Sequence, residues 1–295
     1  MAERVIAGVD FSGAREVPNQ TWLSLGRLDG LGLQIVDLRR VGSHALAGEL
    51  ISTGTLAAAG LDFPFSLPAD FIRFLEEKAG RKPAQSWQEV VEQLILGGFE
   101  DFVTQVELFG KDSKRLTDAF YRRLAQSPLH RGGPSMVQMT YQGMRLLSSL
   151  DPARFSILPF ESWRAGTCAV FEVFPRGMLW CLGLPDSGYK SKEKKDREKM
   201  LTVRRELLKK LIELREQGGE RFRHFPRLTV AKELQHVAID SDDALDAVIA
   251  CYAAAVWVAA PELFLDPLDC DSEDVLLEGW IYAPVKSRAP DPVNK

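Results

Sequence analysis

The chain is poor in cysteine, and its few cysteines are scattered. Cys168, Cys181, Cys251 and Cys270 form no CxxC pair and no cysteine–histidine cluster with the spacing of a zinc site. This arrangement excludes the common structural zinc modules. We therefore expect the four thiols to act as small apolar side chains in a reducing compartment.

A strong excess of charge and a long apolar run are also missing. The 295 residues include 37 Lys and Arg against 41 Asp and Glu, a formal net charge of −4, which argues against wholesale attraction to nucleic acid. No signal-peptide pattern precedes the first apolar segment, and even the run at 244–260 is too short to span a bilayer. We expect a cytoplasmic protein with no membrane contact, and no segment indicates an obligate protein partner.

The sequence does contain acidic residues at the ends of apolar segments. Val5–Val9 is a short apolar run typical of a strand buried on both faces, and it ends in Asp10 and a small-residue turn. A carboxylate at the carboxyl end of such a strand is a common beginning of a site above an α/β sheet. Asp10 taken alone is equally well explained as a residue that caps a turn.

The same ending recurs at Asp62. The fourth expected strand stops there, because Pro64 cannot donate a ladder hydrogen bond. The repetition is more informative than either acid alone. We predict a central first strand, antiparallel pairing of the first three strands, and a fourth strand parallel to the first. The second to fourth strands are expected at 21–28, 33–38 and 55–61, with a short helix at 43–53.

Residues 66–165 are expected to form a helical insertion between core strands, so we predict one domain over 1–295. Helical periodicity and a capping-box pattern at Ser86 support this interpretation. A loop at 130–135 within the insertion carries Arg131 beside two glycines that could let a backbone approach a phosphate. The same glycines are explained more simply as ordinary loop residues with no role in binding.

Two features stand out after the insertion. Glu172 interrupts an apolar strand pattern at 168–174, and an unpaired carboxylate on a buried strand is costly, so we favour a functional role over an edge position. Tyr189 and Lys190 precede a long charged helix that extends to about Glu216. Most of that helix is expected to be a solvated face with local ion pairs, which leaves Tyr189 and Lys190 as candidate ligand contacts.

The last strong signal is an apolar helix that begins among acids at about 240. Acids in its first turn suit the helix dipole, and this accounts for Asp242 without a function. It does not account for Asp246, which lies between apolar residues. Asp243 and Asp246 are three residues apart and share a face, so we predict a raised carboxyl pKa for one of them.

Acids that resist these structural explanations are the ligand type that hard divalent cations prefer. Mg²⁺ or Mn²⁺ typically takes a few carboxylates together with substrate phosphate and water, and such ions support phosphodiester displacement. The order of these elements resembles the ribonuclease H-like fold. The chain has a strand ending in Asp, two strands, a helix, another strand ending in Asp and a late acidic helix. That resemblance implies an α/β fold with a mixed five-stranded sheet flanked by helices.

Short motifs follow one another along nearly the whole chain: Gly8-Val9-Asp10-Phe11-Ser12-Gly13-Ala14, Gly60-Leu61-Asp62-Phe63-Pro64-Phe65, Glu172-Val173-Phe174-Pro175, Tyr189-Lys190, Asp242-Asp243-Ala244-Leu245-Asp246-Ala247 and Glu278-Gly279-Trp280-Ile281. In their order and spacing they resemble the signatures of a ribonuclease H-like family predicted to be nucleases, domain of unknown function 429. The resemblance implies a metal-dependent nuclease that acts on a nucleic acid of undetermined type. The implied metal ligands are Asp10, Asp62, Asp243 and Asp246, with Glu172 as a further catalytic residue and Ser12, Arg131, Tyr189 and Lys190 as substrate contacts.

Two alternatives remain open at this level. An actin-like or sugar-kinase-like phosphotransferase shares the core and opens with a similar Asp-containing turn, but such a kinase carries a second strand and Gly-rich turn in mid-chain, and this sequence has none. A non-catalytic ribonuclease H-like binding module could keep the acids for a structural metal. The acidic balance and the lack of a basic, aromatic stacking platform make sequence-specific nucleic-acid binding doubtful.

Overall fold

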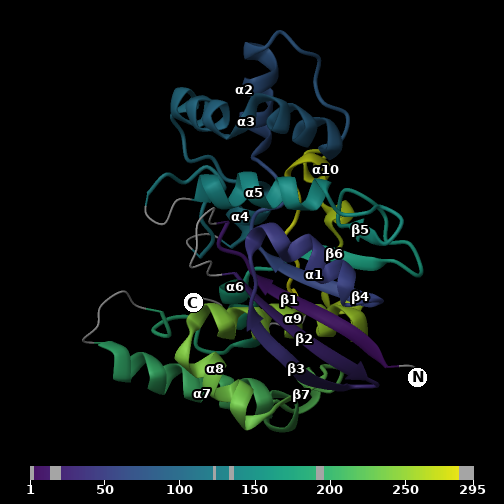
Figure 1. Ribbon diagram of the computed structural model, residues 1–295, viewed down its shortest axis with the longest axis vertical. Coiled ribbons are helices and arrows are strands. Elements are labelled where there is room, and N and C mark those ends of the chain that lie inside the picture. Colours follow the sequence, from purple (N-terminus) through teal and green to yellow (C-terminus); the bar gives the residue numbers. More distant parts are fainter. Residues whose placement is uncertain (1–2, 14–20, 122–123, 133–135, 191–195, 286–295) are drawn as a thin grey trace, which may run out of the picture.

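The apolar run near the N-terminus forms β1 (Arg4–Asp10), which lies in the middle of a sheet. The structure is a computed structural model that describes residues 3–13, 21–121, 124–132, 136–190 and 196–285. Within these ranges a mixed sheet has seven strands in the order β5-β6-β4-β1-β2-β3-β7. Helices flank the sheet, which is the α/β fold that the sequence predicts (Figure 1).

The strands around β1 pair as predicted. β2 (Trp22–Asp29) runs antiparallel to β1, and β3 (Gly32–Arg40) runs antiparallel to β2, so the three form a meander. On the other side of β1, β4 (Leu56–Asp62) is parallel to it, and β6 (Cys168–Glu172) is parallel to β4. The central position of β1 and the direction of β4 are thereby confirmed.

The sheet has seven strands and not the predicted five. β5 (Phe155–Ile157) adds to β6 at one edge, and β7 (Arg227–Val230) adds to β3 at the other. Segments of three and four residues are too short for an alternating pattern to stand out in the sequence. β5 also lies inside the segment 66–165, so the insertion is mostly but not wholly helical.

One face of the sheet is covered by α9 (Asp242–Ala259), which packs on β1, β2 and β4. Every residue of α9 from Ala244 to Val256 is buried. Among the described residues no single helix is long and apolar enough to cross a membrane, and α9 meets that criterion only together with Pro261–Asp269, at a bend of 108°. The same hydrophobic core includes side chains of α6 (Pro175–Leu182), α7 (Arg197–Gln217) and α8 (Lys232–Asp240).

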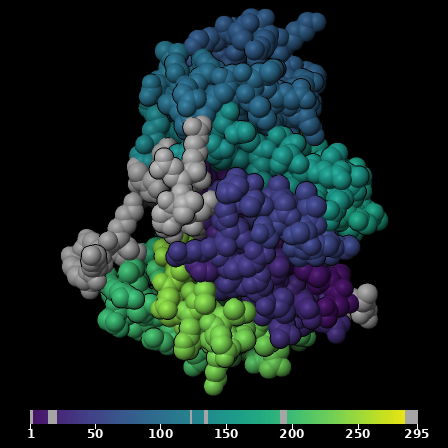
Figure 2. Space-filling view, viewed as in Figure 1, coloured from purple at the N-terminus to yellow at the C-terminus, as the bar shows by residue number. Residues whose placement is uncertain are grey.

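A second core lies on the opposite face of the sheet. It joins side chains of β1 and β4 to those of α5, so part of the helical insertion belongs to the main body. The blue helices α2 and α3 form the top of the molecule, beyond teal α5 (Figure 2). Gly98, with φ 81°, kinks α3. The elements on this side are α1 (Leu46–Ser52), α2 (Ala69–Lys78), α3 (Trp87–Phe109) and α5 (Met136–Ser148).

Two glycines allow α9 to lie unusually close to the sheet. A Cβ atom added to Gly8 would lie 2.0 Å from the backbone nitrogen of Cys251, and one added to Gly60 would lie 2.8 Å from the carbonyl oxygen of Ala250. A side chain at either position would therefore push the helix away from β1 and β4. The close approach matters for function because the N-terminal turns of α9 carry acidic residues.

Candidate metal centre

Asp10 and Asp62 end the two neighbouring parallel strands at the same level. They are direct partners in the register of β1 and β4. Side chains alternate between the faces of a strand, and Ala7 and Val9 belong to the core on the α5 side. Asp10 therefore projects toward α9, and Asp62 does the same because Ala59 and Leu61 also belong to the α5-side core.

Asp246 joins them from α9. Asp10, Asp62 and Asp246 each offer a carboxylate oxygen, and these three atoms lie within 4.8 Å of one another. Asp246 is 1% exposed, whereas Asp10 and Asp62 are partly open to solvent. The sequence thus places three acids from three separate elements around one point, with access from outside.

Lys190 and Tyr189 hold the carboxylate of Asp246. The Lys190 ammonium forms an ion pair with Asp246 Oδ2, and the Tyr189 hydroxyl donates a hydrogen bond to Asp246 Oδ1 at 3.1 Å. Arg204 of α7 fixes this segment, since its Nε donates to the Tyr189 carbonyl oxygen at 2.7 Å and its Nη2 bonds Asp242 at 2.9 Å. Lys190 is nevertheless about half-exposed, with 48% of its side chain accessible.

The electrostatics favour a positive charge at this point. Burial raises the pKa of Asp10 and of Asp62, and the charges of the neighbouring carboxylates raise both pKa values further. Burial likewise raises the pKa of Asp246, which the charge of Lys190 opposes. Burial also raises the pKa of Asp243 to about 6, with a smaller contribution from Asp242. The predicted rise is thus confirmed in direction, but desolvation and not like charge is its largest cause.

A divalent cation fits this set of donors. Three ionised carboxylates and one ammonium carry a net charge of −2, which one divalent cation would neutralise. The donor atoms are all carboxylate oxygens, the ligand type of Mg²⁺ and Mn²⁺. Asp10, Asp62 and Asp246 are the residues of the described chain that could hold the ion.

Asp243 does not belong to this group of three. It lies on the first turn of α9, partly buried, and its charge raises the pKa of Asp10 only as one of the smaller contributions. Of the four residues proposed as metal ligands from the sequence, the structure therefore brings together three. Asp243 lies close enough to influence their charge without joining them.

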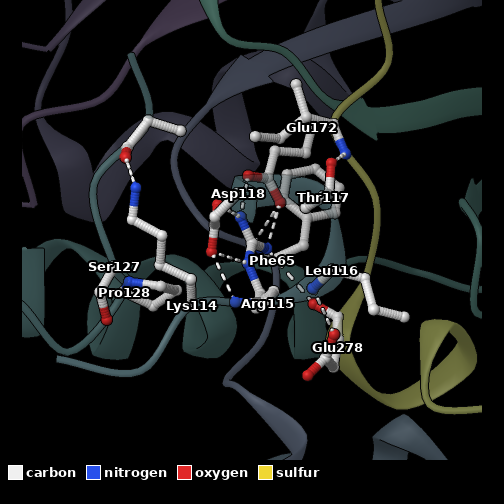
Figure 3. A network of polar contacts seen from close by, with 12 residues as sticks. Phe65, Lys114, Arg115, Leu116, Thr117, Asp118, Ser127, Pro128, Glu172 and Glu278 are labelled. Carbon is white, nitrogen blue, oxygen red and sulfur yellow. Dashed lines mark hydrogen bonds and ion pairs between the residues drawn. The ribbon is translucent and has the colours of Figure 1, made fainter. Parts of the chain in front are cut away.

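Glu172 is not one of the three either, because it points to the opposite face of β6 from α9. Its charge raises the pKa of Asp62 only as one of the smaller contributions. Its carboxylate accepts two hydrogen bonds from Arg115, at 2.6 and 2.7 Å, and one from the Phe65 amide at 2.9 Å (Figure 3). Arg115 is 1% exposed and also pairs with Asp118 at 2.9 Å. These contacts give Glu172 a structural partner, which the sequence could not reveal because Arg115 lies 57 positions away.

This buried network ties the insertion to the C-terminal part of the chain (Figure 3). The Glu278 carbonyl oxygen accepts from Arg115 at 3.3 Å, and the Glu278 carboxylate accepts from the amides of Ala69 and Leu116 at 2.7 and 2.8 Å. Thr117 completes the link by accepting a hydrogen bond from the Ile281 amide at 2.9 Å. The helices that carry the network are α4 (Leu116–Phe120) and α10 (Val275–Glu278).

Ser12 and Arg131, the two other predicted substrate contacts, do not contact Asp246 as Tyr189 and Lys190 do. Ser12 follows Asp10 closely, and its amide and hydroxyl both lie 3.2 Å from the Thr21 hydroxyl, so it links the end of β1 to the residue before β2. Arg131 is exposed and lines neither of the two pockets that Asp62 lines. The structure thus brings Tyr189 and Lys190 to the aspartates but provides no such position for Arg131.

Two pockets border the aspartates. One, of about 280 Å³, is lined by Asp62 and Asp246 together with Lys190, Arg176 and Gly188. The other, of about 340 Å³, shares Asp62 with the first but extends toward Phe63 and α5. Phe174 and Arg176 line both pockets and form, with Asp62, the wall that they have in common.

Comparison with protein families gives one match over most of the chain. A family model described as "Protein of unknown function (DUF429)" matches residues 40–265. The chain belongs to this family. No curated protein and no solved structure matches it.

The DUF429 match includes Asp62, Lys190 and Asp246 and begins after Asp10. It also includes Arg176, which sequence analysis did not single out. Arg176 Nε lies 3.3 Å from Asp186 Oδ2, and no partner is found for its two Nη atoms among the described residues. In the sequence, only its position directly after the Glu172-to-Pro175 motif could have drawn attention to Arg176. That position alone does not show that the side chain lines a pocket.

Proposed function

We propose that the protein is a metal-dependent nuclease that hydrolyses phosphodiester bonds at the centre formed by Asp10, Asp62 and Asp246. The observation that carries the proposal is the convergence of these three carboxylates, from β1, β4 and α9, within 4.8 Å. Carboxylate clusters of this kind suit Mg²⁺ or Mn²⁺, which share their coordination between protein oxygens and substrate phosphate.

The arrangement of the sheet supports this proposal. Its five middle strands follow the order β3-β2-β1-β4-β6, with only β2 antiparallel to its neighbours, and we interpret this as a ribonuclease H-like core. The two aspartates end the central strand and its parallel neighbour. A duplicated phosphotransferase core would require a second sheet, whereas the described residues form a single one. These features favour hydrolysis over phosphoryl transfer.

The cationic side chains are placed to bind the phosphodiester. A bound divalent cation would polarise the phosphate and activate water. Lys190 and Arg176 line the same pocket as Asp62 and Asp246, so their charges attract the phosphate oxygens to that side of the centre. Tyr189 holds Asp246 in place through its hydroxyl. We call the pocket lined by Arg176 and Lys190 the anion subsite.

The test of the proposal is a cleavage assay on the purified protein with single-stranded, duplex, hybrid and branched nucleic acids. We expect cleavage of at least one substrate with Mn²⁺ or Mg²⁺, and none with EDTA, because the buried carboxylates need the cation to bring a phosphate close. Ca²⁺ is expected to support binding without turnover. Failure to cleave any substrate, or cleavage that persists in EDTA, would count against a metal-dependent nuclease.

Metal binding should also stabilise the protein, and more so at higher pH. Raised pKa values of Asp10 and Asp62 mean that their protonated forms favour folding, so this contribution is present at low pH and is lost as the pH rises through the raised pKa values. A divalent cation binds the ionised forms and reverses that loss. We expect saturating Mn²⁺ to raise the melting temperature by about 5 °C at pH 8 and by clearly less at pH 5.

The measurement is differential scanning fluorimetry over a metal titration at both pH values. Ca²⁺ and Mg²⁺ serve as comparisons between hard cations, and K⁺ controls for ionic strength. A melting temperature that does not respond to any divalent cation at pH 8 would argue against the carboxylate centre.

A further inference from the structure

Most of the side chains that line the second pocket beside Asp62 are apolar, whereas half of those that line the anion subsite are charged. Its volume is about 340 Å³, near the lower end of the range for small-molecule sites. Phe63 forms a buried part of its lining, and Phe174, Met136 and Met139 are partly exposed there. We call it the apolar pocket.

Apart from Asp62 and Arg176 at the wall shared with the anion subsite, the charged groups that line the apolar pocket are paired. Arg115, Asp118 and Glu172 are each at most 3% exposed, and Arg115 donates hydrogen bonds to both carboxylates. They therefore offer little to a charged ligand. The rest of the lining is mostly apolar and includes two aromatic rings and two thioethers, which suit a flat apolar group. The Gln126 amide adds a polar contact.

The apolar pocket and the anion subsite meet at a common wall made by Asp62, Phe174 and Arg176. A phosphate bound beside Asp62 would therefore have two cationic side chains, Arg176 and Lys190, on one side and the apolar pocket on the other. A nucleotide has the same pair of features, a phosphate and a planar heterocyclic base. Aromatic side chains stack on any base, and a glutamine amide can hydrogen-bond its edge.

We propose that the apolar pocket takes one unpaired nucleobase of the substrate, so that the protein acts on single-stranded nucleic acid or on a strand with an unpaired nucleotide. This inference rests on the proposed nuclease function and names its substrate class. A base inside a duplex is stacked and paired, and it would have to leave the helix to enter the pocket, at an energetic cost that a single strand avoids.

The test compares two strands that differ only in one base. A short fluorescent oligothymidylate and the same strand with a central abasic site are titrated with the protein in Ca²⁺, and binding is followed by fluorescence anisotropy. The intact strand is expected to bind about tenfold more tightly than the abasic strand, since stacking of one base contributes on that scale. The fully paired duplex is expected to bind no better than the abasic strand, and an oligouridylate serves to compare RNA with DNA.

Met139→Trp is designed to fill the apolar pocket and should reduce the preference for the intact strand to near unity. Leu96→Trp is the matched control, because Leu96 is 84% exposed on α3 and does not line that pocket. Circular dichroism of both variants confirms folding. If Met139→Trp fails to fold, Met139→Lys, which places a charge at the same pocket, is measured in the same way.

The outcomes separate this inference from the proposed function. Equal affinity for intact and abasic strands would overturn the base pocket even if the protein cleaves nucleic acid. A retained preference in Met139→Trp, or tighter binding of the duplex, would overturn it as well. A base-dependent affinity in a protein without cleavage would support the pocket while refuting the nuclease. No binding of any strand would overturn both.

Discussion

Asp10→Asn is expected to reduce metal-dependent cleavage by about a thousandfold while leaving the protein folded. Asp10 ends the central strand and lies in register with Asp62, so its carboxylate belongs to every arrangement in which the three aspartates share a cation. The amide keeps the shape of the side chain but is a neutral and weaker ligand. Loss of several kcal/mol of transition-state stabilisation by a bound cation corresponds to a rate loss of that order.

The same substitution should stabilise the metal-free protein. Burial and three neighbouring carboxylates raise the pKa of Asp10, which means that its ionised form is disfavoured in the folded state. Removing that charge is therefore expected to raise the melting temperature at pH 8 in EDTA, and to remove most of the increase produced by Mn²⁺. Opposite effects of one substitution on activity and stability are typical of a residue retained for function.

A matched control is available in the same sheet. Asp29 ends β2, as Asp10 ends β1, but it is exposed and lies at the opposite end of the antiparallel pair. The Asp29→Asn variant is expected to cleave at the wild-type rate, and Mn²⁺ should raise its melting temperature as much as that of the wild type. Similar activity of Asp10→Asn and Asp29→Asn would show that the activity arises elsewhere or belongs to a contaminant.

Arg115→Met is expected to have the largest effect on stability, a loss of about 3–5 kcal/mol in the free energy of unfolding. Arg115 donates to both oxygens of Glu172 and to both of Asp118, and all three side chains are buried. Methionine fills a similar volume but leaves two carboxylates without their counter-charge. Equilibrium unfolding in urea measures the loss, read as a change in midpoint at constant slope.

The control for this prediction is an exposed ion pair between an arginine and an aspartate in the same part of the molecule. Arg73 bonds Asp274 at 3.1 Å with 55% of its side chain exposed, so Arg73→Met is expected to cost at most about 1 kcal/mol. Adding Glu172→Gln to Arg115→Met should recover part of the lost stability, because one of the two unpaired charges is removed. If Arg115→Met were as stable as Arg73→Met, the buried network would not hold the insertion to the sheet.

The positions of Asp10 and Asp62 could be predicted because each acid ends its own strand, directly after an apolar run. Parallel neighbours place such endings side by side, and the alternation of side chains fixes the face. The same alternation in β6 indicates that the Glu172 side chain does not face the aspartates. Phe171 packs in the core on the α9 side, so the next side chain must point to the other face.

Other features had no local signal in the sequence. The partner of Glu172 is Arg115, far away in the chain, and only the folded insertion brings them together. Arg176 lies at the start of α6, where it lines two pockets that also include residues of distant segments, such as Asp62 and Met139. By contrast, Tyr189 and Lys190 stood out before a charged helix, and the structure places both on Asp246.

The most direct test of the central claim is the anomalous scattering of Mn²⁺ in crystals soaked with the ion. The account predicts a strong anomalous peak bounded by the carboxylates of Asp10, Asp62 and Asp246, and its absence in crystals of Asp10→Asn soaked in the same way. No peak at these carboxylates in the wild-type protein, or peaks only at exposed acids, would contradict the metal centre.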